Sequence, residues 1–259
     1  MSALLAARGI TKSFGGLEAL SDVSLSINSG EIYGLIGPSG AGKTTFFNVL
    51  TGLYKLDGKQ DRGDVMFNEK VISKSEPHQV AKLGIARTFQ NIRLFGNMSV
   101  LENVMVGRHV RTHAGVIGAV MRGSHTRAEE KAIHERSMQL LDYIEISSQA
   151  DRLAKHLAYG DQRRLEIARA LATEPKLLAL DEPAAGMNAT ETEALKKLLQ
   201  TIRADGVTIL LIEHDVKLVM GVCDRVAVLD YGKKIAEGIA QVVRKNPAVI
   251  EAYLGGALA

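Results

Sequence analysis

Residues 37–44 read Gly-Pro-Ser-Gly-Ala-Gly-Lys-Thr, a pattern whose residue types suit phosphate binding. Glycines let a backbone curve around an anion with its amide groups pointing inward, and a following helix adds its positive N-terminal end. Lys43 would reach the terminal phosphates of a nucleotide, and the Thr44 hydroxyl would bind Mg²⁺. The residues expected around the phosphates are Gly37, Pro38, Ser39, Gly40, Ala41, Gly42, Lys43, Thr44 and Thr45.

A second chemical signal is the pair of adjacent acids Asp181 and Glu182, directly after the apolar run 177–180. Ligands bind at the carboxyl ends of strands in open α/β sheets, so a buried strand here would deliver both carboxylates to such an edge. We expect Asp181 to help hold Mg²⁺ and Glu182 to polarise the attacking water. Two acids after a strand can equally form a solvated turn, but together with a complete phosphate loop they predict a nucleoside triphosphatase.

Two further side chains follow strand-like runs and would reach the same edge. His214 comes after the apolar run 207–212, and its imidazole would bind a terminal phosphate and orient the water. Gln90 ends the run 85–89, and its amide oxygen would reach Mg²⁺ or the water. Alone, each residue is more often structural or merely exposed. The other motifs favour a catalytic role for both.

The elements that must position these residues follow from hydrophobic patterning and turn signals. Strands are expected at 4–10, 23–27, 32–36, 177–180, 207–212 and 226–229. Helices are expected at 43–50, from about 160 to 172, and over a leucine-spaced segment that ends at Asp205 and Gly206. Strands that alternate with helices predict an α/β fold with a mostly parallel sheet wrapped by helices.

The middle of the chain is expected to be helical. Ser99 with Glu102, and Thr126 with Glu129, have the spacing of capping boxes that open helices. Residues 107–127 are rich in Gly, His and Arg without clear periodicity, which indicates an inserted loop or an irregular helix. With no internal repeat or Pro-rich linker, one domain with a helical insertion is the simplest organisation.

Composition limits the classes of protein to consider. The 259 residues are 46% hydrophobic and 24% charged, as in ordinary globular proteins, and can bury a sizeable core. A net charge of +3, with both signs interspersed, gives no reason to expect a nucleic-acid partner. The single cysteine, Cys223, excludes an internal disulfide or a multi-cysteine metal site. No run approaches the roughly 18 apolar residues of a membrane span, so we expect a cytoplasmic chain that meets a membrane through a partner.

With these residues assembled, the chain resembles the ATP-binding cassette (ABC) ATPases over essentially its whole length. Residues 157–162, Leu-Ala-Tyr-Gly-Asp-Gln, stand where the family has its Leu-Ser-Gly-Gly-Gln signature, shortly before Asp181. Phe14 stands at the family's adenine-stacking position, usually tyrosine, and a phenyl ring can still stack on a base. The resemblance implies a P-loop NTPase fold with a mostly parallel core sheet, an N-terminal antiparallel β subdomain and an inserted α-helical subdomain.

The resemblance also implies a domain division and a set of partners. The single domain 1–259 would consist of a nucleotide-binding core, approximately 1–90 and 175–259, and a helical subdomain, 91–174, that carries the signature. Two such subunits, identical or different, would form a head-to-tail dimer that binds ATP and Mg²⁺. Two transmembrane permease subunits, and indirectly a substrate-binding protein, would complete a transporter on the inner face of the cell membrane, with no nucleic acid. The residues that would contact ATP in trans are Ala158, Tyr159, Gly160 and Asp161.

Two departures from the family pattern also resemble one subgroup. Ala158 replaces the signature serine, which deletes a hydroxyl and could cost about 1.5 to 3 kcal/mol of phosphate contact. Asn188 replaces the aspartate of the family's dimer-contact loop. Both changes, the stretch 162–169 and the ending 246–255 are similar to the larger ATPase of branched-chain amino-acid importers. The resemblance therefore implies energising the import of hydrophobic amino acids.

Three alternatives remain at this point. A P-loop kinase or GTPase lacks support, because nothing resembles a guanine-reading Asn-Lys-x-Asp segment. An ABC ATPase that acts on nucleic acid or ribosomes usually carries long coiled-coil insertions, zinc-binding cysteines or tandem cassettes, and none is found here. A transporter of another cargo, such as lipopolysaccharide or urea, is separated only by kinship, because ATPases of this family do not touch the cargo.

Overall fold

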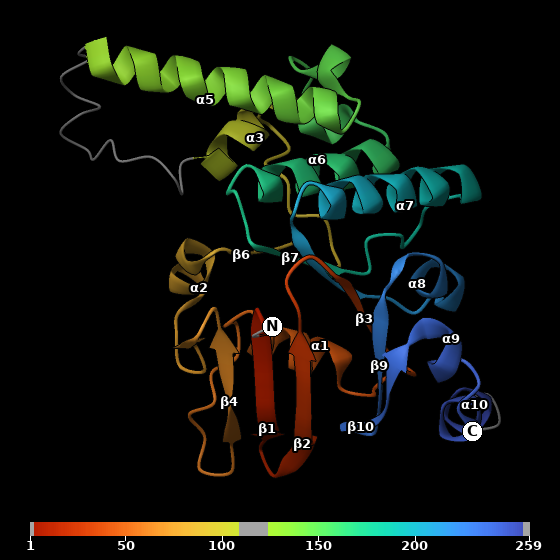
Figure 1. Ribbon diagram of the computed structural model, residues 1–259. Helices are drawn as coiled ribbons and strands as arrows, with labels where there is room; N and C mark the ends of the chain where they lie inside the picture. Colours follow the sequence, from red (N-terminus) through yellow and green to blue (C-terminus); the bar gives the residue numbers. More distant parts are fainter. Residues whose placement is uncertain (1–2, 109–123, 256–259) are drawn as a thin grey trace.

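The computed structural model describes residues 3–108 and 124–255, which form two β-sheets and a group of helices (Figure 1). Most of the segment 107–127, expected to be a loop or irregular helix, lies outside the described residues. In Figure 1 the antiparallel sheet lies below the helices α3, α5, α6 and α7, and the core strands run between them.

The core sheet has six strands in the order β10-β9-β3-β8-β7-β6. The five strands β9, β3, β8, β7 and β6 are parallel to one another, and the edge strand β10 is antiparallel to β9. This confirms the expected mostly parallel sheet, and the apolar runs predicted as buried strands form its centre. The strands are β3 (Ile32–Ile36), β6 (Ile85–Arg87), β7 (Leu177–Asp181), β8 (Thr208–Ile212), β9 (Arg225–Asp230) and β10 (Lys233–Ile239).

The second sheet is antiparallel, with the order β2-β1-β4-β5, and confirms the predicted N-terminal antiparallel part. Its first two strands are longer than the apolar runs 4–10 and 23–27, because cross-strand pairing continues through polar residues to a hairpin turn. The turn contains Gly15 and Gly16, whose φ values of 54° and 93° favour glycine. The strands are β1 (Leu5–Phe14), β2 (Leu17–Ile27), β4 (Arg62–Phe67) and β5 (Lys70–Val71).

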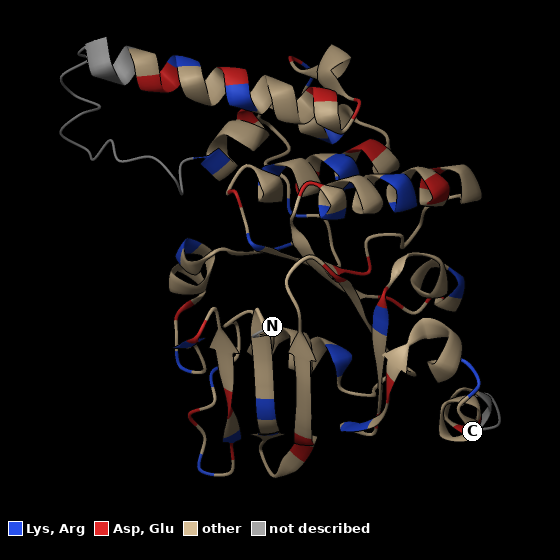
Figure 2. Cartoon of the chain, in the orientation of Figure 1, with Lys and Arg blue, Asp and Glu red and all other residues tan. Residues whose placement is uncertain are grey.

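The helices include all three that hydrophobic spacing predicted, here α1, α6 and α7. In Figure 2, charges of both signs follow one another along α5 and α7, as expected for solvated helix faces. The helices are α1 (Lys43–Leu50), α2 (Pro77–Leu83), α3 (Val100–Arg108), α5 (Ser124–Tyr143), α6 (Tyr159–Leu171), α7 (Ala189–Ala204), α8 (Val216–Val222), α9 (Ala240–Val243) and α10 (Pro247–Gly255), with short 3-10 turns at Ser147–Gln149 and Ala154–His156.

Of the two predicted capping boxes, one is confirmed and one is wrong. The Ser99 hydroxyl accepts from the Glu102 amide at 3.1 Å, and the Glu102 carboxylate accepts from the Ser99 amide at 2.7 Å, at the start of α3. Helix α5 begins at Ser124, two residues before Thr126, so it does not start where the spacing predicted; the Thr126 side chain lies outside the described residues. Threonine is tolerated within a helical turn, and spacing alone therefore does not fix where the helix begins.

Two hydrophobic clusters cover the two faces of the core sheet. Successive residues of a strand point to opposite faces, so Leu178 and Leu180 join the helical cluster, while Leu177 and Ala179 join the cluster against the antiparallel sheet and α1. Because both faces are covered, the central strands β3, β7 and β8 are buried at every position and mostly apolar, as is typical of parallel sheets.

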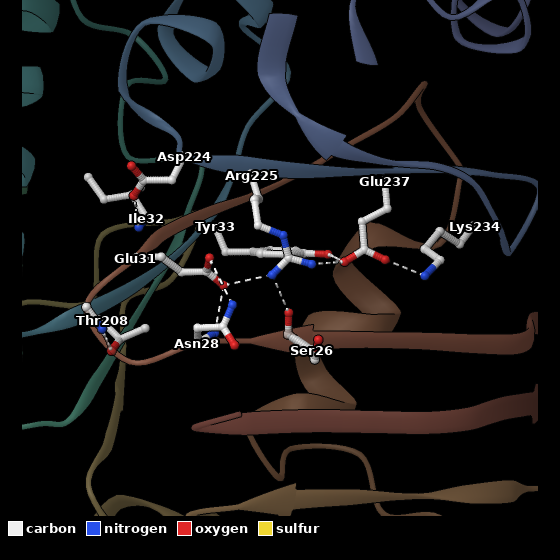
Figure 3. Close-up of polar contacts among 11 residues, drawn as sticks. Ser26, Asn28, Glu31, Ile32, Tyr33, Thr208, Asp224, Arg225, Lys234 and Glu237 are labelled. Atoms are coloured by element: carbon white, nitrogen blue, oxygen red, sulfur yellow. Dashed lines mark hydrogen bonds and ion pairs between the residues drawn. The ribbon is translucent and has the colours of Figure 1, made fainter. Parts of the chain in front are cut away.

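A polar network closes the amino end of β3 (Figure 3). The Arg225 guanidinium donates to the Glu31 carboxylate and to the Ser26 carbonyl, each at 3.1 Å, and to the Glu237 carboxylate at 2.7 Å. The Tyr33 hydroxyl donates to Glu237 at 2.7 Å, and the guanidinium lies 5.2 Å from the centre of the Tyr33 ring. The network ties β2 of the antiparallel sheet to β9 and β10 of the core sheet.

Candidate nucleotide-binding site

The loop between β3 and α1 has the backbone of an anion-binding loop. Gly40 and Gly42 have φ values of 77° and 95°, a region that glycine enters without strain. A Cβ atom at Gly37 would lie 2.1 Å from the Leu229 carbonyl oxygen, so only glycine fits there. No side chain caps the amino end of α1, which leaves its first amide groups available to a ligand.

Lys43 lies over this loop. Its ammonium donates to the carbonyl oxygens of Gly37 at 2.8 Å and of Pro38 at 2.9 Å. Burial lowers the pKa of Lys43, although the nearby carboxylates of Glu182 and Asp181 act in the opposite direction. Because phosphate oxygens are stronger partners for an ammonium than neutral carbonyls, the lysine can exchange these contacts for an anion.

A cavity of about 510 Å³ opens at the second half of the loop. It is lined by residues 40–45 together with Leu17 and Glu18 at the start of β2 and Tyr231 after β9. Phe14 does not line this cavity: its side chain is 43% exposed and packs edge-on against Tyr54, with ring centres 5.3 Å apart.

Some residues around the loop were not predicted. Tyr231 could have been found, since it follows the apolar run 226–229 and the carboxyl ends of parallel strands meet at one edge. Pro38 and Ser39 face a different cavity, of about 610 Å³, which they share with Asp230 and the carboxyl-terminal helix α10. No sequence signal connected α10 to the phosphate loop.

Asp181 and Glu182 lie where β7 ends. Asp181 is buried, and burial raises the pKa of its carboxyl even though Arg87 nearby acts to lower it. Glu182 has φ = 48°, a left-handed conformation that is strained for a side chain of this kind and typical of functional sites. Its amide donates to the Ile212 carbonyl at 2.9 Å, which holds the strained turn against β8.

The side chains of Gln90, Glu182 and His214 come together at this edge. The Gln90 amide nitrogen donates to Glu182 Oε2 at 2.9 Å, and His214 Nδ1 lies 3.8 Å from the same oxygen. His214 is 63% exposed on its side chain and therefore accessible to a ligand. They come from chain segments that follow three neighbouring strands, β6, β7 and β8, as the patterning suggested.

Glu213 is a further residue at this edge that the sequence did not single out. Its fully buried carboxylate accepts from the amides of Ala184 at 2.9 Å and His214 at 3.2 Å, and it lies 3.7 Å from His214 Nδ1. Burial raises the pKa of Glu213, against the effect of these amides. An acid directly after a buried strand was the available signal, the same one that identified Asp181.

The signature segment lies at the amino end of α6. Ala158 is the N-cap and offers no side-chain hydrogen bond, so the first amides of the helix have no side-chain cap. Tyr159 is exposed, and Asp161 accepts from the Gln149 side chain at 3.0 Å. A Cβ atom at Gly160 would lie 2.6 Å from the Glu191 carboxylate, so a larger residue there would require that side chain to move. None of the signature residues lines the cavity at the phosphate loop of the same chain.

Asn188, which departs from the family's aspartate, caps α7. Its side-chain oxygen accepts from the Glu191 amide at 3.0 Å, and the Glu191 carboxylate accepts from the Asn188 amide at 2.9 Å. Asparagine and aspartate are equally good N-caps, so the substitution preserves the start of the helix.

The oxygen groups at the site suit Mg²⁺. Thr44 lines the cavity and offers a hydroxyl, and the Asp181 carboxylate makes no hydrogen bond or ion pair with the described part of the chain. Gln90 donates through its amide nitrogen, which leaves its amide oxygen free to coordinate. Within residues 3–108 and 124–255, no three His, Cys, Asp or Glu side chains are arranged to hold a metal by themselves. A Mg²⁺ ion at a nucleotide usually takes one or two protein carboxylates and shares its other positions with phosphate and water.

No membrane-crossing element is found in the described ranges. None of their helices is both long and apolar enough to pass through a bilayer.

Sequence comparison places the chain in a family. Residues 20–185 match the family model described as ABC transporter, and residues 233–259 match the model described as branched-chain amino acid ATP-binding cassette transporter. The chain is 46% identical over 255 residues to the high-affinity branched-chain amino acid transport ATP-binding protein LivG of Salmonella typhimurium, covering 98% of both chains. It is 42% identical to the corresponding protein BraF of Pseudomonas aeruginosa, again with 98% of both covered.

Structural comparison agrees. A crystal structure of the ADP conformation of an ATP-binding cassette of an ABC transporter superposes with a TM-score of 0.84 at 34% identity, covering 98% of this chain and all of the other. These similarities confirm the expected resemblance to branched-chain importer ATPases, the P-loop fold class and the ATPase class. The phosphate loop, the two acids after β7 and the signature at α6 thus occur in a chain that belongs to the ABC transporter family.

Proposed function

We propose that the chain is the ATP-hydrolysing subunit of an importer of branched-chain, hydrophobic amino acids. The observation that carries the cargo assignment is the full-length similarity to LivG, joined to the match of residues 233–259 with the branched-chain transporter model. The chemistry is supported by the geometry, in which a phosphate loop lies near two carboxylates, a glutamine and a histidine.

In this proposal the loop residues 37–45 bind the phosphates of ATP, with Lys43 at the terminal phosphates. Glu182 accepts a proton from the attacking water, and its carboxylate lies close enough to Lys43 of the loop to act on the pKa of that lysine. His214 binds the terminal phosphate and orients the water, and Gln90 fixes the Glu182 carboxylate through its 2.9 Å contact. Phe14 would stack on the base beside the cavity, and Leu17 and Tyr231, which line the cavity, would contact the nucleotide.

Thr44, Asp181 and Gln90 would hold Mg²⁺. Bound there, the ion would neutralise charge on the phosphates that Lys43 reaches. Asp181 suits this role because its carboxylate is buried and makes no hydrogen bond or ion pair with the described residues.

The proposal includes a head-to-tail dimer with a second ATPase subunit, identical or different. The amino end of α6 would present Ala158, Tyr159, Gly160 and Asp161 to the nucleotide of the partner, through amides without a side-chain cap. The domain would divide into a core at about 1–90 and 175–259 and a helical subdomain at 91–174. Phe95, 47% exposed and close to Gln90 in sequence, would face one of two permease subunits on the inner face of the membrane.

Uptake of radiolabelled leucine, isoleucine and valine tests the proposal in cells with and without this subunit. We expect uptake to require the wild-type subunit and to be absent with Lys43→Ala, which keeps the chain but removes the phosphate-binding ammonium. Uptake that is the same in all three strains would reject the cargo. If the purified chain then hydrolyses ATP, the transporter carries another cargo; if it does not, the ATPase assignment itself is wrong.

A further inference from the structure

Arg163, in the second turn of α6, is buried with only 2% of its surface exposed. Its guanidinium donates to the carbonyl oxygen of Phe89 at 2.7 Å and to that of Gln90. Two donors of one rigid fork thus hold two successive carbonyls. The side chain joins α6 directly to the backbone that carries Gln90.

Glu166 holds the Arg163 guanidinium in this orientation. Its carboxylate lies 3.2 Å from the Arg163 guanidinium and also accepts from the Arg93 amide at 3.4 Å. A buried guanidinium without an acid would be strongly unfavourable, so the pair is interdependent. Glu166 therefore also holds the backbone at Arg93, three residues after Gln90.

The segment before Gln90 is held from the opposite side by Arg87. Its guanidinium lies between the rings of Phe47 and Phe89, 4.7 and 4.6 Å from their centres. It also donates to the side chains of Asn48 at 3.0 Å and Thr51 at 2.7 Å, which belong to α1 and its carboxyl end. The backbone at this point is clamped between the phosphate-loop helix α1 and the signature helix α6.

Arg163 also touches the signature itself. Its guanidinium lies 3.2 Å from the Tyr159 hydroxyl, while the Gln90 side chain that it anchors reaches Glu182 at 2.9 Å. A single buried side chain therefore connects an exposed residue at the amino end of α6 with the glutamine beside the carboxylate.

We propose that Arg163 is a positioning residue that couples the signature end of α6 to Gln90. Nucleotide bound at Tyr159 would shift α6, and Arg163 would carry that shift to the backbone of Gln90 and so to Glu182. The inference rests on the proposed function, because only in a head-to-tail dimer do Tyr159 and Gln90 of one chain serve two different nucleotides. Arg163 then links the two sites.

A double-mutant cycle with the full-length chain tests this role. Arg163→Lys keeps a positive charge near Glu166 but loses the fork that spans two carbonyls. We expect it to lower kcat for ATP hydrolysis about tenfold while KM changes less than about twofold, since the phosphate loop is untouched. In a Gln90→Ala background, the same substitution is expected to change kcat by less than about twofold, because the group it positions is gone.

The matched control is Arg164→Gln. Arg164 is also an arginine and is the next residue of α6, but in the described chain it makes no contact with the segment that carries Gln90. This variant should retain wild-type kcat. Thermal unfolding and equilibrium ATP binding check that Arg163→Lys is folded. An unchanged kcat in Arg163→Lys, or an equal loss in both backgrounds, would overturn the proposal. A wild-type chain without ATPase activity would instead reject the proposed function.

If Arg163→Lys is unstable, the variant Tyr159→Phe tests the same coupling independently. Tyr159 is exposed and the change removes only the hydroxyl that touches Arg163. We expect the Hill coefficient for ATP to fall towards one, because the hydroxyl that links Tyr159 to Arg163 is gone. A wild-type Hill coefficient of one, or a coefficient that the substitution does not change, would contradict the link between sites.

Discussion

Charged side chains near the two ends of the core strand β3 differ in whether they form ion pairs. At its amino end, Arg225 is paired with Glu31 and Glu237, and Lys234 completes the pairing of Glu237 (Figure 3). Beyond its carboxyl end, the Lys43 ammonium donates, among the described residues, only to carbonyl oxygens of its own loop. The charges of the network at the amino end are therefore paired directly, whereas Lys43 has the carboxylates of Glu182 and Asp181 nearby but makes no direct ion pair with them.

The pKa directions show the same difference. Burial raises the pKa of Glu237, but hydrogen bonds from Lys234 and Tyr33 outweigh it and leave the pKa below the ordinary value. Burial likewise raises the pKa of Glu213 at the carboxyl end, and there the backbone amides do not compensate. Acids whose pKa is lowered by their partners stabilise the folded state when ionised, while buried acids whose pKa is raised destabilise it when ionised and are typical of working sites.

Glu182→Gln should produce the largest contrast between the two ends. We expect kcat for ATP hydrolysis to fall at least about 100-fold, because the amide cannot accept the proton of the water. ATP should still bind and trap a stable dimer, observed by gel filtration with ATP. The matched control Glu237→Gln, at the amino end, should keep wild-type kcat. Near-normal turnover in Glu182→Gln would show that another group is the base.

Lys43→Ala should have the next largest effect. Losing the charge-assisted contacts to phosphate is expected to weaken ATP binding by about 10-fold to 100-fold or more, from about 1.5 to 3 kcal/mol per contact. Equilibrium nucleotide binding measures it. Lys234→Ala removes a lysine from the network of Figure 3 and should leave affinity unchanged. Equal affinities for wild type and Lys43→Ala would refute the role of the loop.

The smallest expected effect is on the pH dependence of the free energy of unfolding, which should differ between the variants Glu213→Gln and Glu237→Gln. The lowered pKa of Glu237 contributes stability above the ordinary glutamate value, about 4.3, and this is lost as pH falls through the folded pKa. The raised pKa of Glu213 acts oppositely: the folded protein holds the proton more tightly, so stability falls as pH rises through the folded pKa.

Urea unfolding at pH 4 and pH 7 distinguishes the two acids. From the lower to the higher pH, the free energy of unfolding of Glu237→Gln should fall relative to wild type, and that of Glu213→Gln should rise, each by about 1 kcal/mol or less. Shifts of the same sign would remove the difference between the two ends.

Much of the site follows from the sequence because its signals are local. A glycine-rich loop must follow a strand and precede a helix, and the run 177–180 with two acids after it indicates a buried strand with carboxylates at its end. Such patterns fix backbone torsion and burial over a few residues, which is why α1 and β7 were predicted close to their observed bounds.

Other features depend on contacts between distant segments. The sequence separates Gln90 from Glu182 by 92 residues, and only the strand order β8-β7-β6 brings them to 2.9 Å. The left-handed turn at Glu182 is held by a hydrogen bond to β8, and no local signal predicts it for a glutamate. Strand order and strain are set by the packing of the whole domain, where many weak contacts outweigh local preference.

The sequence by itself therefore determined the phosphate loop, the acids at the strand end and the kind of chemistry they support. Tertiary structure decided that Phe14 lies beside Tyr54 instead of in the cavity at the loop, and that Arg163 is a buried link and not a solvated charge. The physical reason is that burial of a side chain depends on what packs against it, and for Arg163 that partner is a segment 73 residues earlier in the chain.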